Sequence, residues 1–118
     1  MSTQEVAKRF YELSQTGEWN KILDELYSPE AMSLEPALAQ GLKSVNGLDN
    51  IREKGKQWAS AIEETHGGYT NEPQVAGNYF TCTMGVDMTM KGKGRMKIDE
   101  VALYEVQNGK IIKEQFFF

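Results

Sequence analysis

Two glutamates in this sequence are suited to acid–base chemistry, because each is predicted to lie beside apolar residues. Glu35 ends a short alternating stretch directly before Pro36, and Glu100 shares its alternation with Ile98 and Ala102. An ionised carboxylate buried without a partner is costly, so an inward-facing acid has either a raised pKa or a partner. A carboxyl with a raised pKa can act as a general acid or base. Alternatively, both glutamates point to solvent at strand ends.

The single histidine offers a second acid–base candidate. His66 follows two glutamates and precedes Gly67-Gly68. A pair of Glu35 and His66 would combine two groups that exchange protons near neutral pH. The alternative is an exposed histidine at a helix C-terminus, where it interacts with the helix dipole.

Helical spacing dominates the first half of the chain. Ser2 and Glu5 have the spacing of a capping box, and apolar residues then recur every three or four positions. Asn46 can cap a third helix, which is predicted to end at or shortly before Gly67-Gly68. The predicted helices are residues 3–15, a shorter one over 19–26, and one that begins after residue 46. A short strand, 31–35, lies between the last two and is followed by a loop from Pro36 to Asn46.

The second half changes to a period of two, which is typical of strands. Asn108-Gly109 is a strong hairpin signal, because both central positions of a type I′ turn need a positive φ. The predicted strands are residues 69–75, 79–90, 95–106 and 110–117. Helices followed by an antiparallel meander predict an α+β fold in one domain, residues 1–118.

The apolar side chains of these strands predict two packed faces. Phe80, Met84 and Met88 share one face of strand 79–90, which the helices are expected to cover. In strand 95–106 both phases contain apolar residues, for example Val101 against Tyr104. Such a strand is covered on both faces, most simply by a second copy of the protein, or it contains a bulge that shifts the phase.

Composition excludes several classes of function. The 118 residues carry a formal net charge of −4, which argues against a nucleic-acid or anionic-membrane binder. One cysteine, Cys82, and one histidine cannot build a usual zinc site, and Cys82 is expected to be an inert buried thiol. No apolar run approaches the roughly 18 residues of a membrane span, and the N-terminus lacks a signal-type stretch, so a cytoplasmic location is expected.

The order of predicted elements resembles the SnoaL-like branch of the nuclear-transport-factor-2-like superfamily, over nearly the whole chain. That superfamily includes ketosteroid isomerases, polyketide cyclases and dehydratases, and the resemblance implies a cystatin-like cone of three helices on a strongly curved mixed or antiparallel sheet. The segments that carry the resemblance are Arg9-Phe10-Tyr11, Leu26-Tyr27-Ser28-Pro29-Glu30-Ala31, Glu35-Pro36, Gly47–Ile51-Arg52-Glu53, Asn108-Gly109-Lys110-Ile111 and the closing Glu114-Gln115-Phe116-Phe117-Phe118.

The resemblance places three isomerase roles on this sequence. Glu35 occupies the slot of the general base, and either Asp99 or Glu100 that of the protonated acid of the oxyanion hole. The tyrosine of the oxyanion hole falls at Phe10, which has no hydroxyl; Tyr11 replaces it only if it turns inward, about 100° away on the helix. Loss of this donor costs roughly a hundred- to a thousandfold in rate, so steroid isomerisation is not expected.

Three hypotheses remain open from the sequence. In the first, a small apolar or carbonyl-containing molecule binds in a helix–sheet pocket and Glu35 performs isomerase-, cyclase- or dehydratase-type chemistry without a metal or other cofactor. In the second, the protein binds such a molecule without catalysis. In the third, the interior is filled by side chains and the protein is a homodimeric interaction module. The residues expected to line the pocket are Phe10, Tyr11, Trp58, Met84, Met88 and Tyr104.

Overall fold

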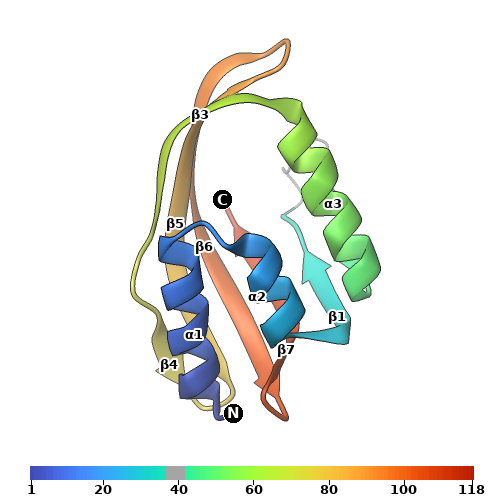
Figure 1. The fold of residues 1–118 in the computed structure, drawn as a ribbon, viewed down its shortest axis with the longest axis vertical. Helices are drawn as coiled ribbons and strands as arrows, with labels where there is room; N and C mark the ends of the chain where they lie inside the picture. Colours follow the sequence, from blue (N-terminus) through green and yellow to red (C-terminus); the bar gives the residue numbers. More distant parts are fainter. Residues whose placement is uncertain (37–41) are drawn as a thin grey trace.

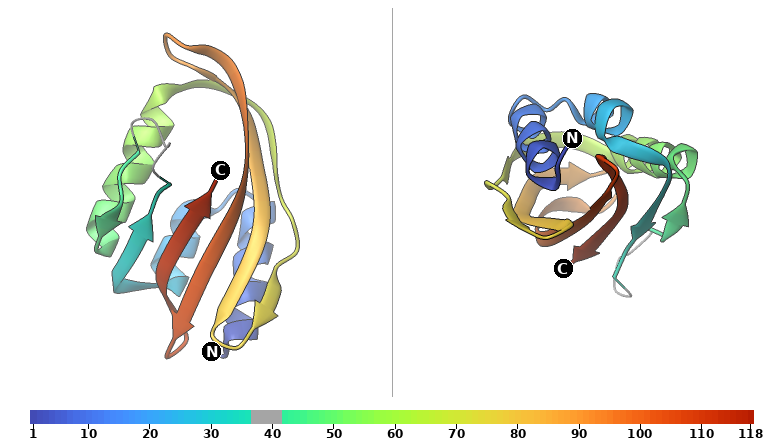
Figure 2. Two further views of the ribbon diagram at one scale, coloured as in Figure 1. Left: turned by 180° about the vertical axis from the view of Figure 1, so that it is seen from behind. Right: turned by 90° about the horizontal axis from the view of Figure 1, so that it is seen from below.

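The computed structural model describes residues 1–36 and 42–118 and has an α+β architecture (Figure 1). In this part of the chain three helices lie on one side of a curved sheet, as the end-on view in Figure 2 shows. The strands form a mixed sheet in the order β2-β1-β7-β6-β5-β3, with β4 paired to β5. The α+β prediction and the curved mixed sheet are therefore confirmed.

The elements follow one another along the chain as helices first and long strands last. The helices are α1 (Thr3–Gln15), α2 (Trp19–Leu26) and α3 (Leu48–Ala61); the strands are β1 (Tyr27–Leu34), β2 (Val45–Asn46), β3 (Ile62–Thr70), β4 (Gln74–Ala76), β5 (Tyr79–Met90), β6 (Gly94–Gln107) and β7 (Lys110–Phe117). No helix within residues 1–36 and 42–118 is long and apolar enough to cross a membrane.

Local sequence signals explain the ends of α1 and of the last hairpin. Ser2 and Glu5 form the predicted capping box, in which each side chain accepts a hydrogen bond from the other residue's backbone. Asn108 and Gly109 both have positive φ, at 52° and 76°, as a type I′ turn requires. This turn pairs β6 with β7 and so fixes which side chains of the two strands face the helices.

The start of β1 and the two ends of α3 differ from the prediction. The strand predicted over 31–35 already begins at Tyr27. Asn46 is not the helix cap, because it pairs in β2 and Gly47, with φ 91°, takes the cap position without a side-chain bond. The segment predicted as a loop after Pro36 lies partly outside the described residues.

The third helix ends at Ala61 and the chain continues directly as β3. Ile62–Thr70 pairs with β5 along its length, so backbone hydrogen bonds to a long neighbouring strand override the local helical pattern. The strand predicted over 69–75 is consequently divided between the end of β3 and the short β4, with Pro73 between them.

The core lies where α1 and α2 cover the sheet. Phe10 of α1 packs against Phe80 and Tyr104, with ring centroids 5.5 and 4.8 Å away, and the latter two rings stack at 4.7 Å. The inner face of β5 is buried as predicted, and its buried residues are Phe80, Cys82, Met84, Met88 and Met90.

The opposite face of the sheet is not covered by any helix in the described part of the chain, as seen from behind in Figure 2. Val101 and Phe117 are direct neighbours on this face and are 42% and 47% exposed. The β5–β6 register runs without interruption from Tyr79 to Met90, so a bulge within this pair does not explain the two-sided apolar pattern of β6. The register of β6 shifts instead between Glu105 and Val106, where β6 pairs with β7.

Candidate functional site

Polar side chains replace apolar ones on the inner sheet face as the strands run away from α1 and α2. Ser33 of β1 lies beside Glu114 of β7, which in turn lies beside Tyr104 of β6. Phe116 and Ala102 form the next inner-face pair along β7 and β6. Glu100 follows Ala102 by one inward-facing position, so two carboxyls flank an apolar step on the sheet.

A continuous chain of hydrogen bonds joins the sheet to α3. The Tyr27 hydroxyl donates to Oε1 of Glu114, and the Ser33 hydroxyl donates to Oε2 of the same carboxylate at 2.6 Å. The Lys54 ammonium donates to Ser33 at 2.5 Å and to Oε2 of Glu35 at 2.8 Å. One lysine thus serves two acids, Glu35 directly and Glu114 through Ser33.

The charged groups of this network are buried, so the loss of one partner would cost folding free energy. The side chains of Glu35 and Lys54 are 6% and 11% exposed, so their ion pair is partly desolvated. Burial raises the pKa of Glu114, against the hydrogen bonds from Ser33 and Tyr27, which lower it. Burial, followed by the charge of Glu114, raises the pKa of Tyr27 well above its usual range. Removal of the Lys54 cation would leave acidic groups in the interior without compensation.

Glu100 and its neighbour Asp99 occupy opposite faces of β6. Burial, followed by the charges of Glu35 and Glu114, raises the pKa of Glu100 to about 7. Asp99 is exposed and accepts a hydrogen bond from the Tyr69 hydroxyl at 2.6 Å on the outer face. Of the two acids that the sequence left as alternatives, Glu100 is therefore the one that faces the interior.

Glu35 faces inward, but with a cation beside it. Its carboxylate is bound to Lys54, and its backbone N–H donates to the Ser44 hydroxyl at 3.0 Å. Of the alternatives that the sequence left open, the solvent-facing orientation is wrong for this side chain. The ion pair also gives the carboxylate a structural function, because it ties the end of β1 to α3.

His66 lies apart from Glu35, because it belongs to β3 rather than to the end of a helix. Its Nε2 is 2.7 Å from the Thr89 hydroxyl, and its Nδ1 is 3.8 Å from Oε2 of Glu64. The prediction that His66 lies at the C-terminus of a helix is therefore wrong. The structure also does not bring His66 together with Glu35 as an acid–base pair.

Most of the residues expected to line a pocket are buried. Phe10 and Tyr104 lie in the closed core under α1 and α2. Trp58 of α3 is half-buried, and Met84 is the cross-strand partner of Glu100, with Met88 further along the same face of β5. Met84 belongs to the same buried cluster as Phe10 and Tyr104, Phe116 packs against that cluster, and Met88 is fully buried.

Two further residues that the sequence singled out, Tyr11 and Cys82, lie on α1 and β5. Tyr11 is half-buried on α1, one position after Phe10. Cys82 is buried, and burial followed by the charge of Glu100 raises its pKa to about 12. The thiolate is the reactive form of cysteine, so this thiol is unreactive at neutral pH.

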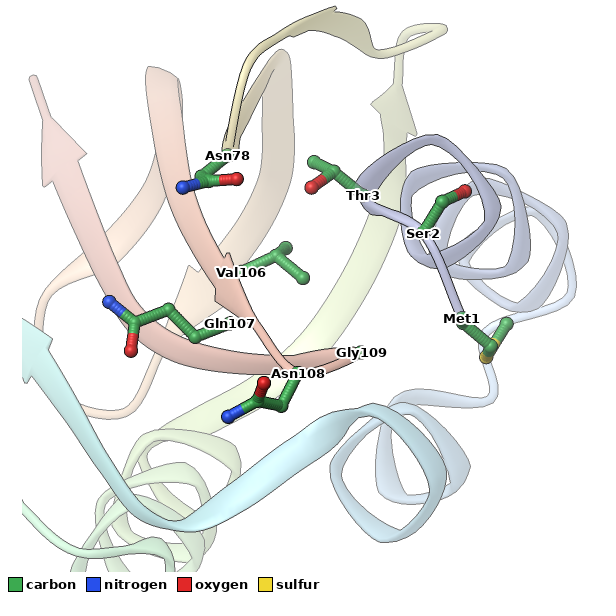
Figure 3. Close-up of a pocket in the computed structure, with 8 residues that line it drawn as sticks. All are labelled: Met1, Ser2, Thr3, Asn78, Val106, Gln107, Asn108 and Gly109. Carbon is green, nitrogen blue, oxygen red and sulfur yellow. The ribbon is translucent and has the colours of Figure 1, made fainter.

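Two surface hollows of about 640 and 620 Å³ lie near the N-terminus. Figure 3 shows the first, between the start of α1 and the β6–β7 turn, with the polar ends of Asn78, Gln107 and Asn108 around it. Neither hollow is lined by Glu35, Lys54 or Glu100. These hollows are therefore separate from the acidic groups of the interior.

Sequence reasoning gave no role to Tyr27, Ser33, Lys54 or Glu114 of the network, and the last three carry a recognisable signal. Lys54 lies three residues after the buried Ile51 and four before Trp58, so it is on the inner side of α3. Ser33 and Glu114 are polar residues in strand phases that are otherwise apolar. A polar or charged residue at a position where the pattern expects an apolar one is the common signal.

Comparisons with known proteins agree with this architecture. A family model described as a SnoaL-like domain matches residues 1–118. A protein from Mesorhizobium loti, named as a candidate SnoaL-like polyketide cyclase and also as a carbohydrate phosphatase, has a similar structure with a TM-score of 0.92. It is 34% identical, and the match covers 100% of both chains. No curated protein matches the sequence significantly.

More distant structures share the fold alone. A protein of cystatin-like fold from Xanthomonas campestris is 20% identical, with a TM-score of 0.80 over 99% of this chain and 90% of that one. A protein of ketosteroid isomerase-like fold from Catenulispora acidiphila, solved in complex with trimethylamine, is 15% identical with a TM-score of 0.74 over 97% and 85% of the two chains. The family model over residues 1–118, together with 34% identity to a relative that is matched over its full length, shows that this chain belongs to the SnoaL-like family.

Proposed function

We propose that this protein binds a small carbonyl-containing molecule between α3 and the sheet, and that Glu100 moves a proton to or from it. The observation that carries the proposal is the carboxyl of Glu100, which faces the interior and has a pKa of about 7. A group that titrates near the working pH is an efficient general acid or base. Isomerase-, cyclase- and dehydratase-type reactions all need such a group.

The surroundings of Glu100 fit this role. Its cross-strand partner is Met84, and the apolar pair Ala102 and Phe116 lies one position further along the inner face. No side chain of the described residues forms a hydrogen bond or ion pair with Glu100, which leaves its carboxyl free to meet a ligand. The similarity to a candidate polyketide cyclase supports a carbonyl-containing substrate class.

Glu35 then acts on the reaction through its charge. Its carboxylate is already bound by the Lys54 ammonium at 2.8 Å. Its negative charge also contributes to the raised pKa of Glu100. We therefore assign proton transfer to Glu100 and give Glu35, the base expected from the sequence, a supporting role.

Deuterium exchange at carbon tests the assignment. A panel of cyclic ketones and enones is incubated with the protein in D₂O between pH 5 and 9, and the loss of α-proton signals is followed by NMR. The wild-type protein is expected to accelerate exchange of at least one compound, with an apparent pKa near 7. Glu100→Gln abolishes the acceleration, whereas Asp99→Asn, on the opposite face of the same strand, retains it.

Two results would overturn the assignment. Exchange that persists in Glu100→Gln and disappears in Glu35→Gln would return the role of base to Glu35. If the wild-type protein binds members of the panel but accelerates none, the protein is a ligand binder without this chemistry. Glu35→Gln is expected to keep exchange and to shift its pH profile to lower pH, because one charge that repels the ionised form of Glu100 is removed.

A second proposal concerns assembly and rests on the outer sheet face. We propose that Val101 and Phe117 contact a second copy of the chain, because they are adjacent, apolar and uncovered by the described helices. Light scattering after size exclusion is expected to give a dimer for the wild-type protein and a monomer for Val101→Glu. A wild-type monomer would disprove the proposal.

A further inference from the structure

We propose that Lys54 is a second catalytic group, whose ammonium donates a hydrogen bond to the carbonyl oxygen of the ligand and stabilises negative charge that develops there. The inference rests on the proposed function, since it names the group that works opposite Glu100. It also restricts the class of ligand to molecules whose oxygen gains negative charge during the reaction, as a ketone does when it becomes an enolate.

The position of Lys54 is unusual for a lysine. It lies on the inner side of α3, with its side chain only 11% exposed, although a lysine normally extends into solvent. Its nitrogen reaches the Ser33 hydroxyl at 2.5 Å and Glu35 at 2.8 Å. These two contacts fix the ammonium in place at the wall of the interior.

A count of donors shows what the lysine can still do. A lysine ammonium has three N–H donors. Two of them have acceptors among the described residues, Ser33 and Glu35. The third has none there, and the nitrogen lies 6.0 Å from the centre of the Phe116 ring. An oxygen of a ligand that rests on this ring would complete the coordination of the ammonium.

The strand register places Glu100 on the other side of the same apolar surface. Phe116 is paired with Ala102, and Glu100 is the next inward-facing residue beyond Ala102 on β6. The Lys54 ammonium lies over the Phe116 ring, so a molecule held beside this ring would have the ammonium on one side and the carboxyl of Glu100 on another. This is the arrangement required for proton transfer at a carbon next to a carbonyl.

The reaction balances without another reactant. The ionised carboxylate of Glu100 takes a proton from the α-carbon, and the C–H electron pair becomes the C=C bond of an enolate. The C=O π pair moves onto oxygen, where the N–H of Lys54 stabilises the charge by a hydrogen bond while its proton stays on nitrogen. Return of the proton from Glu100 to a carbon atom completes an isomerisation. Loss of a donor of this kind typically lowers kcat by roughly a hundred- to a thousandfold.

Binding of 4-nitrophenol tests the inference separately from catalysis, because its phenolate mimics an enolate oxygen and absorbs in the visible range. At a pH where free probe is mainly neutral, the wild-type protein is expected to shift the bound probe toward phenolate. Lys54→Met is expected to lose this shift and to lower the rate of ketone exchange at least a hundredfold, mainly in kcat. Arg52→Met, on the same helix in an exposed ion pair with Asp24, keeps both properties.

Lys54→Met can be interpreted only if it folds, and this variant leaves the Glu35 carboxylate without its cation. A double variant therefore serves as a second test. Lys54→Met combined with Glu35→Gln removes both charges and is expected to fold, yet still to lose the phenolate shift. The inference would be overturned if either Lys54 variant has the circular dichroism spectrum of the folded protein and still shifts bound 4-nitrophenol toward phenolate. If the wild-type protein exchanges no ketone but its phenolate shift still depends on Lys54, the proposed function fails and the oxygen-binding role of Lys54 stands.

Discussion

Replacement of Glu100 by glutamine should stabilise the protein, and the gain should depend on pH. The pKa of Glu100 rises from 4.5 to about 7 on folding, so the folded state holds a proton that the unfolded state has lost between these values. Stability therefore falls as pH rises through this window. At about 1.4 kcal/mol per pKa unit the full cost is at most about 3 kcal/mol, and solvent screening at a half-buried site reduces it to about 1–2 kcal/mol.

Urea unfolding of the wild-type protein and of Glu100→Gln at several pH values measures this cost. The two free energies of unfolding are expected to agree near pH 4, where both side chains are neutral, and Glu100→Gln is expected to be more stable by about 1–2 kcal/mol at pH 8. Asp99→Asn serves as the control, since Asp99 lies on the outer face with Tyr69. A Glu100→Gln protein that is no more stable than the wild type at pH 8 would refute the raised pKa.

Three further predictions follow from individual contacts. Cys82, whose pKa is about 12, is expected to react with iodoacetamide at pH 8 only after unfolding, and rapid labelling of the native protein, read by mass spectrometry, would contradict its burial. Gly85→Ala is expected to lower the melting temperature, because its Cβ would lie 2.4 Å from the Tyr69 ring; an unchanged melting temperature would show that the ring moves freely. In Gly109→Ala the new Cβ would lie 2.8 Å from the Met1 nitrogen, at a position whose φ is 76°. The free energy of unfolding in urea is therefore expected to fall by about 1–2 kcal/mol, and an unchanged value would mean that the turn relaxes.

The strands of the second half were predictable because each carries an alternating pattern and a clear turn signal. The predicted bounds of β5 and β7 agree with the structure, and Asn108-Gly109 forms the predicted turn. The end of α3 was not predictable in this way. Pairing of Ile62–Thr70 with β5 is a contact between distant segments, and it overrides a local pattern that resembles a helix.

The site was predictable where one residue broke a regular pattern. The alternation of β6 placed Glu100 beside Ala102 on the inner face, and the structure agrees. The cation beside Glu35 was not foreseen, because Lys54 is nineteen positions away on another element and only the packing of α3 on β1 brings the two together. His66 lies in the segment Ile62–Thr70, whose pairing with β5 is a contact between distant parts of the chain, so its position could not be predicted from the local sequence.

A titration of the side-chain carboxyl carbons by ¹³C NMR tests the central claim most directly, with Glu100→Gln used to assign the Glu100 resonance. The resonance is expected to titrate with a pKa near 7 in the wild-type protein and at a lower value in Glu35→Gln, because removal of the neighbouring charge eases ionisation. A value near 4.5 in the wild-type protein would show that Glu100 is an ordinary surface acid and would contradict the proposed chemistry.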